Sequence, residues 1–242
     1  MKNTTLLLLV LLQGYYVANC QEVLLEETVS NDSIEPLYGR NYPHFLHLYV
    51  NYGLIMGPNN EGSKIIYGRS SNRSIGLRYK GKLNNVVALG SDLSYQHTSY
   101  LLFQDTSKVL PSNNLHKKEK LVVHQIALGF YLRTNWGKRG NFIGNFIDLG
   151  GNFHIPVTSV HQTKDTFNQP TENGGTVVKT KTTGLDFIQP YFSTAIVRFG
   201  INRFVLTGTY RITDLFKKAD IQESSYPEFP NMIIGLEIGF HK

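Results

Sequence analysis

The side chains that could do chemistry in this 242-residue chain lie in two places. Ser159, His161 and Asp165 share one polar segment, and His97 and Ser99 lie close together near the end of an apolar stretch. A serine becomes a nucleophile when a histidine within hydrogen-bond reach takes its proton and an acid orients that histidine. Such triplets also arise by chance in polar loops. We therefore expect these residues to be solvated rather than catalytic.

The chain lacks the motifs of established catalytic and cofactor sites. It has no His-Glu-x-x-His zinc motif, no Gly-x-Ser-x-Gly elbow, no phosphate-binding glycine loop and only one cysteine. Its net charge of +6 comes from 24 Lys and Arg against 18 Asp and Glu, and these are scattered rather than gathered into a stripe. We predict a non-enzyme with no metal, no cofactor and no nucleic-acid partner.

Residues 1–20 are typical of a secretory signal peptide. Lys2 precedes an apolar run from Leu6 to Leu12, and small residues follow before Gln21. The apolar run is about half of the roughly 20 residues that a spanning helix needs. Cys20 is either the last residue before the cleavage site or the lipid-bearing first residue of a lipoprotein, and the neighbouring Asn19 favours cleavage. Residues 21–43 are interpreted as a polar lead-in segment on the periplasmic side.

Residues 44–242 show apolar and polar side chains in alternation, the pattern of a strand with one apolar face. The high content of glycine, tyrosine and phenylalanine also favours strands and tight turns. In the sixth stretch Ile188, Phe192 and Ile196 blur the alternation, and Pro190 marks a bulge or strand end. The eight predicted strands run from Leu46 to Met56, Ser74 to Leu83, Val87 to Thr98, Val122 to Arg133, Ile143 to Ile155, Leu185 to Phe199, Arg203 to Ile212 and Met232 to His241.

The connections between these stretches alternate in length. Short links at 81–85, 134–140 and 200–202 alternate with longer polar links at 57–71, 99–119, 156–184 and 214–230. An even strand number with alternating short and long connections is the pattern of outer-membrane barrels, whose turns are periplasmic and whose loops are extracellular. The pattern predicts an all-β fold, an eight-stranded antiparallel up-and-down transmembrane β-barrel.

Alternation alone does not say which face looks inward. A secreted, lipocalin-like barrel would hold the apolar face inside. The polar face carries many glycines and charges of both signs, which suit a crowded lumen better than a solvated exterior. The membrane barrel is therefore favoured. The charges expected to point into its lumen are Arg78, Lys80, Asp92, Arg133, Asp148 and Glu237.

Aromatic residues near the predicted strand ends are expected to form a girdle at headgroup depth. This set comprises Tyr38, Tyr42, Tyr95, Tyr100, Phe103, Trp136, Phe142, Phe199 and Phe204.

The export signal, the eight alternating segments and the ending Pro227-Glu-Phe-Pro-Asn-Met-Ile-Ile-Gly-Leu-Glu-Ile-Gly-Phe240 resemble the outer-membrane β-barrel domain proteins of Bacteroidota. The likeness covers most of the mature chain. It implies a bacterial outer-membrane location, with Phe240 as the terminal aromatic of the insertion signal, although His241 and Lys242 follow it. One branch of the family is associated with type IX secretion, and no motif places this chain in that branch.

A barrel of eight strands is just wide enough for its own side chains to fill, which argues against a diffusion pore. We therefore expect a membrane anchor or interaction module that contacts outer-membrane lipids and engages an envelope or secretion-complex protein through its loops. Two alternatives remain open, an outer-membrane lipid-modifying enzyme with a rim active site and a secreted ligand-binding barrel. The sequence leaves the oligomeric state undetermined.

Overall fold

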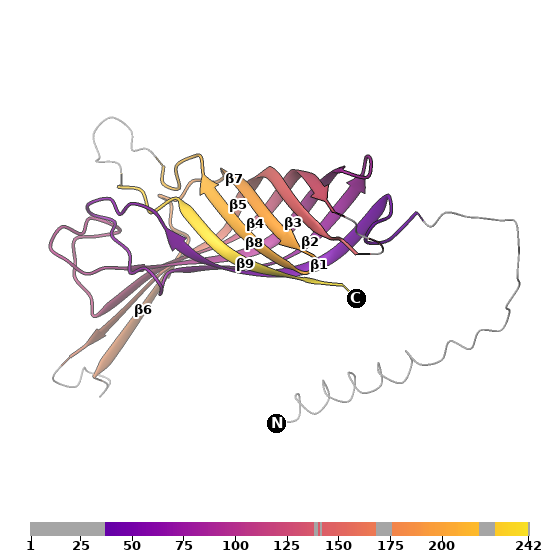
Figure 1. Ribbon diagram of the computed structural model, residues 1–242. Helices are drawn as coiled ribbons and strands as arrows, with labels where there is room; N and C mark the ends of the chain where they lie inside the picture. Colours follow the sequence, from indigo (N-terminus) through magenta and orange to yellow (C-terminus); the bar gives the residue numbers. More distant parts are fainter. Residues whose placement is uncertain (1–36, 138–139, 141, 168–175, 218–225, 242) are drawn as a thin grey trace, which may run out of the picture. The chain divides into compact units, whose positions relative to one another are not determined.

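The computed structural model describes residues 37–137, 140, 142–167, 176–217 and 226–241. The predicted signal peptide and most of the predicted lead-in segment lie outside these residues. Within them the chain is all β (Figure 1). The strands are β1 (His44–Met56), β2 (Ser71–Lys82), β3 (Val87–Leu102), β4 (Lys118–Trp136), β5 (Asn145–Thr166), β6 (Val177–Thr183), β7 (Phe192–Ile201), β8 (Phe204–Arg211) and β9 (Met232–Phe240).

Eight of these strands close into an antiparallel barrel, as predicted. Each strand pairs with its neighbours in chain order except at β6, and β9 returns to pair with β1. The strand β6 pairs only with the far end of β5, so β7 occupies the next place in the wall. Closure leaves the wall without a free edge.

The register fixes the tilt of the strands. A row of directly paired residues that starts at Leu46 in β1 and passes once around the wall returns to β1 at Met56, ten residues along. For eight strands, a stagger of this size gives a tilt of about 40° and a backbone diameter of about 16 Å. The barrel is therefore too narrow to hold an open channel once its inward side chains are in place.

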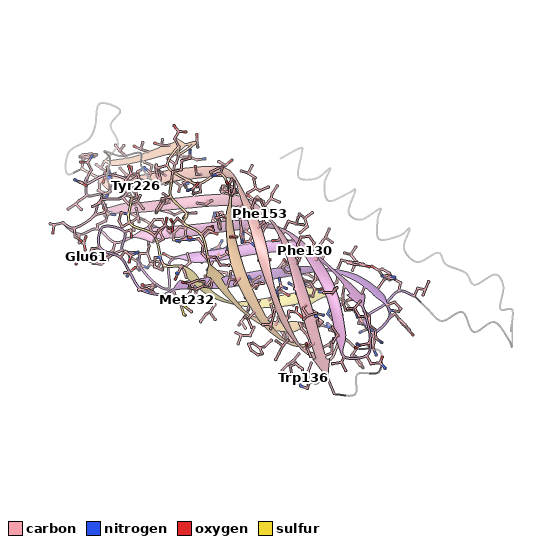
Figure 2. The ribbon with its side chains drawn as sticks, turned by 90° about the horizontal axis from the view of Figure 1, so that it is seen from above. Glu61, Phe130, Trp136, Phe153, Tyr226 and Met232 are labelled. Atoms are coloured by element: carbon pink, nitrogen blue, oxygen red, sulfur yellow. The ribbon has the colours of Figure 1, made fainter. Side chains whose placement is uncertain are left out.

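The apolar side chains point outward, as the alternation predicts. Leu48, Leu128 and Leu149 are about half exposed on the outer wall, whereas Arg78, Asp92 and Asp148 are buried inside it. Figure 2 shows Phe130 and Phe153 on the wall, and Trp136 at the opposite end of the barrel from Glu61 and Tyr226. This sidedness is the reverse of a lipocalin, so the lipocalin-like alternative is wrong. It is the sidedness of a membrane β-barrel.

The two ends of the barrel differ. We call the end with the short connections, residues 83–86, 137–144 and 202–203, the turn end. We call the other end, with residues 57–70, 103–117, 157–191 and 212–231, the loop end. The β7–β8 turn has only two residues, and Asn202 there has a φ of 55°, a left-handed conformation that asparagine tolerates.

The lumen is filled in three layers, which follow one another along β3. Asp92 lies in a charged layer near the turn end, Gln96 and Thr98 lie in a layer of amides and hydroxyls, and Tyr100 and Leu102 reach an apolar layer at the loop end. The alternation predicts the first two layers but not the third. Polar side chains therefore fill only the first two layers of the lumen, and apolar side chains fill the third.

The apolar layer closes the loop end, and we call it the cap. Inward residues of the strands, such as Ile55, Leu121 and Phe192, pack there against Leu110, Phe216 and Phe229 from the long loops. Tyr100 belongs to the cap, where its ring stacks on that of Phe229 at 4.3 Å. Its predicted place in the outer aromatic girdle is therefore wrong. The cap also explains why Ile188 and Phe192 blur the alternation, because both belong to it.

Most predicted strand ends shift by one to four residues, and two boundaries differ by more. The strand expected to begin at Leu185 begins at Phe192, two residues after Pro190, because the segment before it folds into the cap. The link expected at 156–184 is largely a hairpin, since β5 continues to Thr166 and β6 pairs with it. A bulge between His124 and Gln125, opposite Pro156, absorbs the extra residue where β5 leaves the apolar wall. At the loop end the β5–β6 hairpin projects away from the barrel wall (Figure 1).

Candidate functional site

Six buried charges near the turn end form a chain of ion pairs across the lumen. Arg78 donates through Nε to Asp92 Oδ1 at 2.6 Å and through Nη2 to Glu237 Oε2 at 2.8 Å. Its Nη1 donates to Glu237 Oε1. Arg198 donates through Nη2 to Asp92 Oδ2 at 2.5 Å. Three arginines and three carboxylates take part, so the network is neutral.

The network ends at Arg133, whose Nε and Nη2 donate to the two oxygens of Asp148 at 2.7 and 2.8 Å. Arg198 Nη1 lies 3.6 Å from the same carboxylate and links the two halves. Register accounts for these contacts, because Arg133 directly opposes Asp148, and Asp148 directly opposes Arg198. Aromatic rings cover the guanidinium groups, with Phe146 3.6 Å from Arg133 Cζ.

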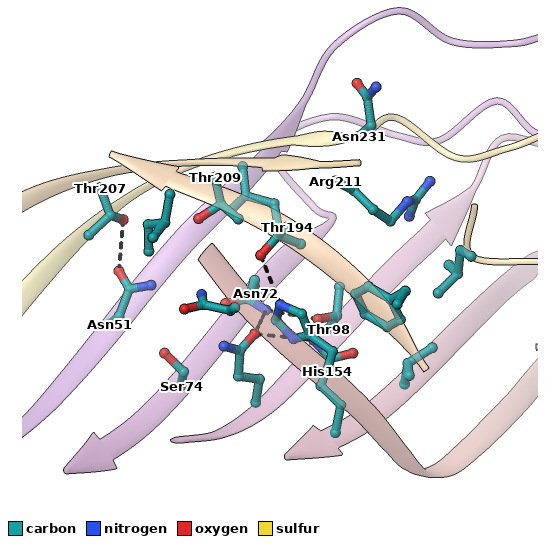
Figure 3. Close-up of a pocket in the computed structure, with 18 of the residues that line it drawn as sticks. Asn51, Asn72, Ser74, Thr98, His154, Thr194, Thr207, Thr209, Arg211 and Asn231 are labelled. Carbon is teal, nitrogen blue, oxygen red and sulfur yellow. Dashed lines mark hydrogen bonds between the residues drawn. The ribbon is translucent and has the colours of Figure 1, made fainter. Parts of the chain in front are cut away.

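The middle layer leaves one small cavity, shown in Figure 3. Asn72 donates to Thr98 Oγ1 at 2.8 Å, and His154 Nε2 lies 2.9 Å from Thr194 Oγ1. The cavity has a volume of about 50 Å³, room for one or two water molecules at roughly 30 Å³ each. It is too small for an organic ligand. Within the described residues, the ion pairs lie on one side of this cavity and the cap lies on the other.

The candidate triplet of Ser159, His161 and Asp165, which the sequence does not favour as catalytic, is not assembled. His161 Nε2 lies 2.7 Å from Glu119 Oε1, whereas His116 Nδ1 lies 2.8 Å from Asp165 Oδ2. Ser159 Oγ accepts a hydrogen bond from the Leu185 backbone N–H at 2.9 Å, which ties the base of the hairpin to the following loop. The three residues share a strand but have separate partners.

The second candidate pair is also separated. His97 lies on the outer wall, where its ring meets that of His124 edge to face at 4.9 Å. Ser99 is buried. His124 Nδ1 is 2.6 Å from the Tyr95 hydroxyl, so these rings form a polar rim between the apolar wall and the loop end. This position suits a headgroup boundary rather than nucleophilic catalysis.

Glu119 is the centre of a polar cluster above the cap. Lys108 Nζ donates to its Oε2 at 2.5 Å, and Gln104 Nε2 donates to the same oxygen at 2.9 Å. Burial raises the pKa of Glu119, but the hydrogen bonds from His161, Lys108 and Gln104 outweigh burial and hold it below the usual value. At Asp165 the hydrogen bond with His116 lowers the pKa of the carboxyl. These contacts fix the loops on the cap.

The sequence signals miss this cluster because its members come from separate loops and strands. Lys108 and Gln104 lie in one loop, Glu119 lies in β4 and His161 in β5. The one available signal is strand parity, which places Glu119 on the same side as the cap residues Leu121 and Val123.

No helix among the described residues is long and apolar enough to cross a membrane. No protein-family model matches the chain, and no curated protein matches its sequence. Two solved structures of Ail, the attachment invasion locus protein of Yersinia pestis, are similar to it. The structure in complex with the heparin analogue sucrose octasulfate is 12% identical, with a TM-score of 0.31 over 80% of this chain and 94% of Ail. The other is 13% identical, with a TM-score of 0.31 over 81% and 95%. The fold assigned to this chain rests on its own strand pairings.

Proposed function

We propose that the chain is a non-enzymatic integral protein of the bacterial outer membrane. Its narrow barrel serves as an anchor, and its loop end faces outward to engage an envelope or secretion-complex protein. One observation carries the proposal: the outer wall is apolar, while a neutral network from Glu237 to Arg133 crosses the lumen near the turn end and the cap closes the loop end. Apolar side chains on such a wall suit acyl chains, and a filled lumen suits an anchor rather than a pore.

The finer parts of this proposal follow from the sequence. Export by a cleaved signal peptide at residues 1–20 and membership of the Bacteroidota barrel proteins remain predictions. Purifying the chain from a Gram-negative host and determining the mass of its mature form tests the first. Cleavage after Cys20 gives a chain that starts at Gln21, whereas lipidation leaves a heavier chain that starts at Cys20.

The β5–β6 hairpin is the part of the loop end best placed to meet a partner. All seven residues of β6 are exposed, and the strand has β5 as its one neighbour. Its other edge offers free backbone groups to which a partner's strand can be added. Among the strands that the structure describes, the barrel wall has no such edge, so the hairpin is the place where a partner's strand can be added.

The location is tested by membrane fractionation combined with gel migration of unboiled and boiled samples. A folded barrel migrates differently before and after boiling, and we expect this behaviour in the outer-membrane fraction. Recovery in the aqueous fraction would defeat the proposal.

In planar bilayers the purified protein should show no steady conductance, and a stable open level would contradict the filled lumen.

The role of the hairpin is tested by shortening it. Gln162 and Lys181 are directly paired, so replacing residues 163–180 with an Asn-Gly turn shortens the hairpin while keeping the register. The variant should keep its heat-dependent migration but lose crosslinks to envelope proteins formed by the wild type.

The enzyme alternative is tested by mass spectrometry of membrane lipids. Lipid modification that requires expression of the protein and is abolished by His161→Ala would overturn the non-enzymatic assignment.

A further inference from the structure

Five lysines lie on one face of the sheet formed by β4, β5 and β6 at the loop end. They surround an open hollow of about 450 Å³ that Gln162, Thr163 and Thr180 also line. The lysines are Lys118, Lys120, Lys164, Lys179 and Lys181, and we call them the lysine face.

Two pairs within the lysine face are directly opposed across the sheet. Lys118 pairs with Lys164, and Lys164 pairs with Lys179, so one row carries three positive charges on three adjacent strands. Like charges in directly opposite positions destabilise a sheet. Lys120 lies in the adjacent row, opposite Gln162, which pairs with Lys181. Burial, then Lys118, then Arg73 lower the pKa of the Lys120 ammonium group. The free protein therefore holds unrelieved repulsion here.

Strand alternation keeps carboxylates off this face. Glu119 and Asp165, each adjacent in sequence to members of the lysine face, make their ion pairs with Lys108, His161 and His116 instead. In the parts of the chain that the structure describes, none of the five lysines forms a salt bridge.

Protection of an edge strand explains only part of the lysine face. Lysines on an edge strand protect it against pairing with other chains, and Lys179 and Lys181 lie on such a strand. At Lys164, β5 is paired with β4 on one side and with β6 on the other. Lys118 pairs with Lys164, and the next residue of β4, Glu119, also pairs with β3. Edge protection gives no reason for charges there.

The lysine face continues the lipid-facing side of the wall. Leu128, Ile126 and His124 lie on the same face of β4 as Lys120, and Val122, which lies between His124 and Lys120 on this face, is buried. Lys120 is six residues beyond Ile126, about 20 Å along the strand and about 15 Å in height at a tilt of about 40°. The polar layer of an ordinary bilayer is only about 5–8 Å thick on each side. The lysines therefore lie above the phosphate level of simple phospholipids.

We propose that the lysine face binds phosphate groups carried on the saccharide headgroup of an outer-leaflet glycolipid. The ammonium groups neutralise several phosphates at once, and the glycolipid's acyl chains lie against the apolar wall below. The inference rests on the proposed outer-membrane location and extends it by naming the lipid chemistry that the protein selects. Lysines act as point charges toward phosphate, so a row of three suits a ligand with more than one phosphate.

The test uses the full chain, folded in zwitterionic micelles and verified by heat-dependent migration. Native mass spectrometry gives apparent dissociation constants for four probes: a bis-phosphorylated glucosamine-disaccharide lipid, the same lipid dephosphorylated, phosphatidic acid and soluble inorganic polyphosphate. We expect the phosphorylated glycolipid to bind at least tenfold more tightly than the dephosphorylated lipid and phosphatidic acid, with an affinity that falls as salt rises.

The variant K118Q/K164Q/K179Q removes the row of three. We expect its dissociation constant for the phosphorylated glycolipid to rise at least tenfold, while K118R/K164R/K179R stays within threefold of the wild type. The matched control R69Q/R203Q/K217Q removes the same charge from exposed positions that do not line the hollow of the lysine face and should change the constant less than twofold. Should the triple variant fail to fold, K164Q and K179Q separately should each weaken binding at least twofold.

Several results would overturn the proposal. These are glycolipid binding unchanged in folded lysine variants, equal weakening in the control variant, a preference for phosphatidic acid, and polyphosphate binding that matches or exceeds glycolipid binding. The last result would assign the lysine face to a soluble polyanion. Before any lipid is added, the wild type is tested for heat-dependent migration. Absence of this migration would contradict the proposed function rather than the lipid proposal.

Discussion

Arg78 and Glu237 are 159 positions apart in the chain and form a two-pronged ion pair inside the barrel. Arg78 comes from β2 and Glu237 from β9, so the pair spans β1, which lies between them in the wall. The side chain of each is about 2% exposed or less. The pair and its neighbour Asp92 hold three strands together from within.

Replacing Glu237 with Gln should destabilise the folded barrel strongly. The change keeps the side chain's shape but leaves a net positive charge in the lumen, because Asp92 already serves both Arg78 and Arg198. We expect a loss of about 3–5 kcal/mol in the free energy of unfolding. Urea unfolding in lipid vesicles, followed by the fluorescence of Trp136, measures it. Glu61→Gln, on an exposed loop, should change it by less than about 0.5 kcal/mol. A similar small value for Glu237→Gln would contradict a structural role for the pair.

Replacing Gly150 with Ala should distort the wall. A Cβ at this position would lie 2.2 Å from the backbone oxygen of Phe130, which is fixed in the adjacent strand. Overpacking of this kind costs about 1–3 kcal/mol or more. The matched control is Gly208→Ala, whose nearest neighbour would be the Val197 backbone oxygen at 3.9 Å. The temperature at which heat-dependent migration is lost should fall for Gly150→Ala and remain close to the wild-type value for Gly208→Ala. Equal temperatures for the two variants would show that the wall can relax around the added methyl.

Replacing Phe229 with Ala should open the cap. Its ring stacks on Tyr100 and also meets Phe216 edge to face at a centroid distance of 5.2 Å. Loss of a buried phenylalanine costs about 3–5 kcal/mol. Because the cap joins all four long connections to the wall, we expect faster cleavage of the loop end by protease while the strands remain protected. Phe103→Ala, at a half-exposed position, is the control. Equal cleavage rates for both variants would show that the cap does not fix the loops.

Acid should weaken the loop end through Glu119. The folded protein holds the pKa of this carboxyl below its ordinary value of 4.5, so the unfolded segment binds a proton first as the pH falls. The stabilisation is complete above pH 4.5 and is lost as the pH falls through the folded pKa. Hydrogen exchange in the 103–117 loop, measured from pH 7 to pH 3 and corrected for intrinsic rates, should show this loss of protection.

The variant Glu119→Gln separates this carboxyl from other acidic groups. It should have weaker protection at pH 7, because Lys108 loses its charged partner. Its protection should then change less with pH than that of the wild type. An acid profile as steep as that of the wild type would assign the effect to other groups, such as Asp165.

Strand parity predicts much of the barrel from the sequence. It places Arg78, Arg133 and Glu237 inside and leucines outside, because one face of a two-sided strand must meet acyl chains and the other must not. The alternating lengths of the connections also place the loop end correctly. Parity says which face a residue occupies but not how far along the lumen it lies. Tyr100 shares the inward parity of Gln96 and Thr98. Its expected place in the outer girdle rests only on its nearness to a predicted strand end and is wrong, because it lies in the cap.

The contacts of the loop end could not be predicted in the same way. Closeness in sequence groups His161 with Ser159 and Asp165, whereas its partner Glu119 comes from the neighbouring strand. The strand β6 was missed because all of its residues are exposed, so it carries no alternation of buried and solvated positions. Its one structural signal is its pairing with β5, which depends on β5 extending past the apolar wall.

The pairing of β1 with β9 has a consequence for biogenesis. Until β9 arrives, β1 keeps a row of unpaired amide and carbonyl groups, and Arg78 lacks one of its two carboxylates. A partly assembled sheet therefore cannot enter the hydrocarbon without burying unsatisfied polar groups. We therefore expect insertion to be coupled to ring closure, with β1 and β9 kept out of the hydrocarbon until they meet.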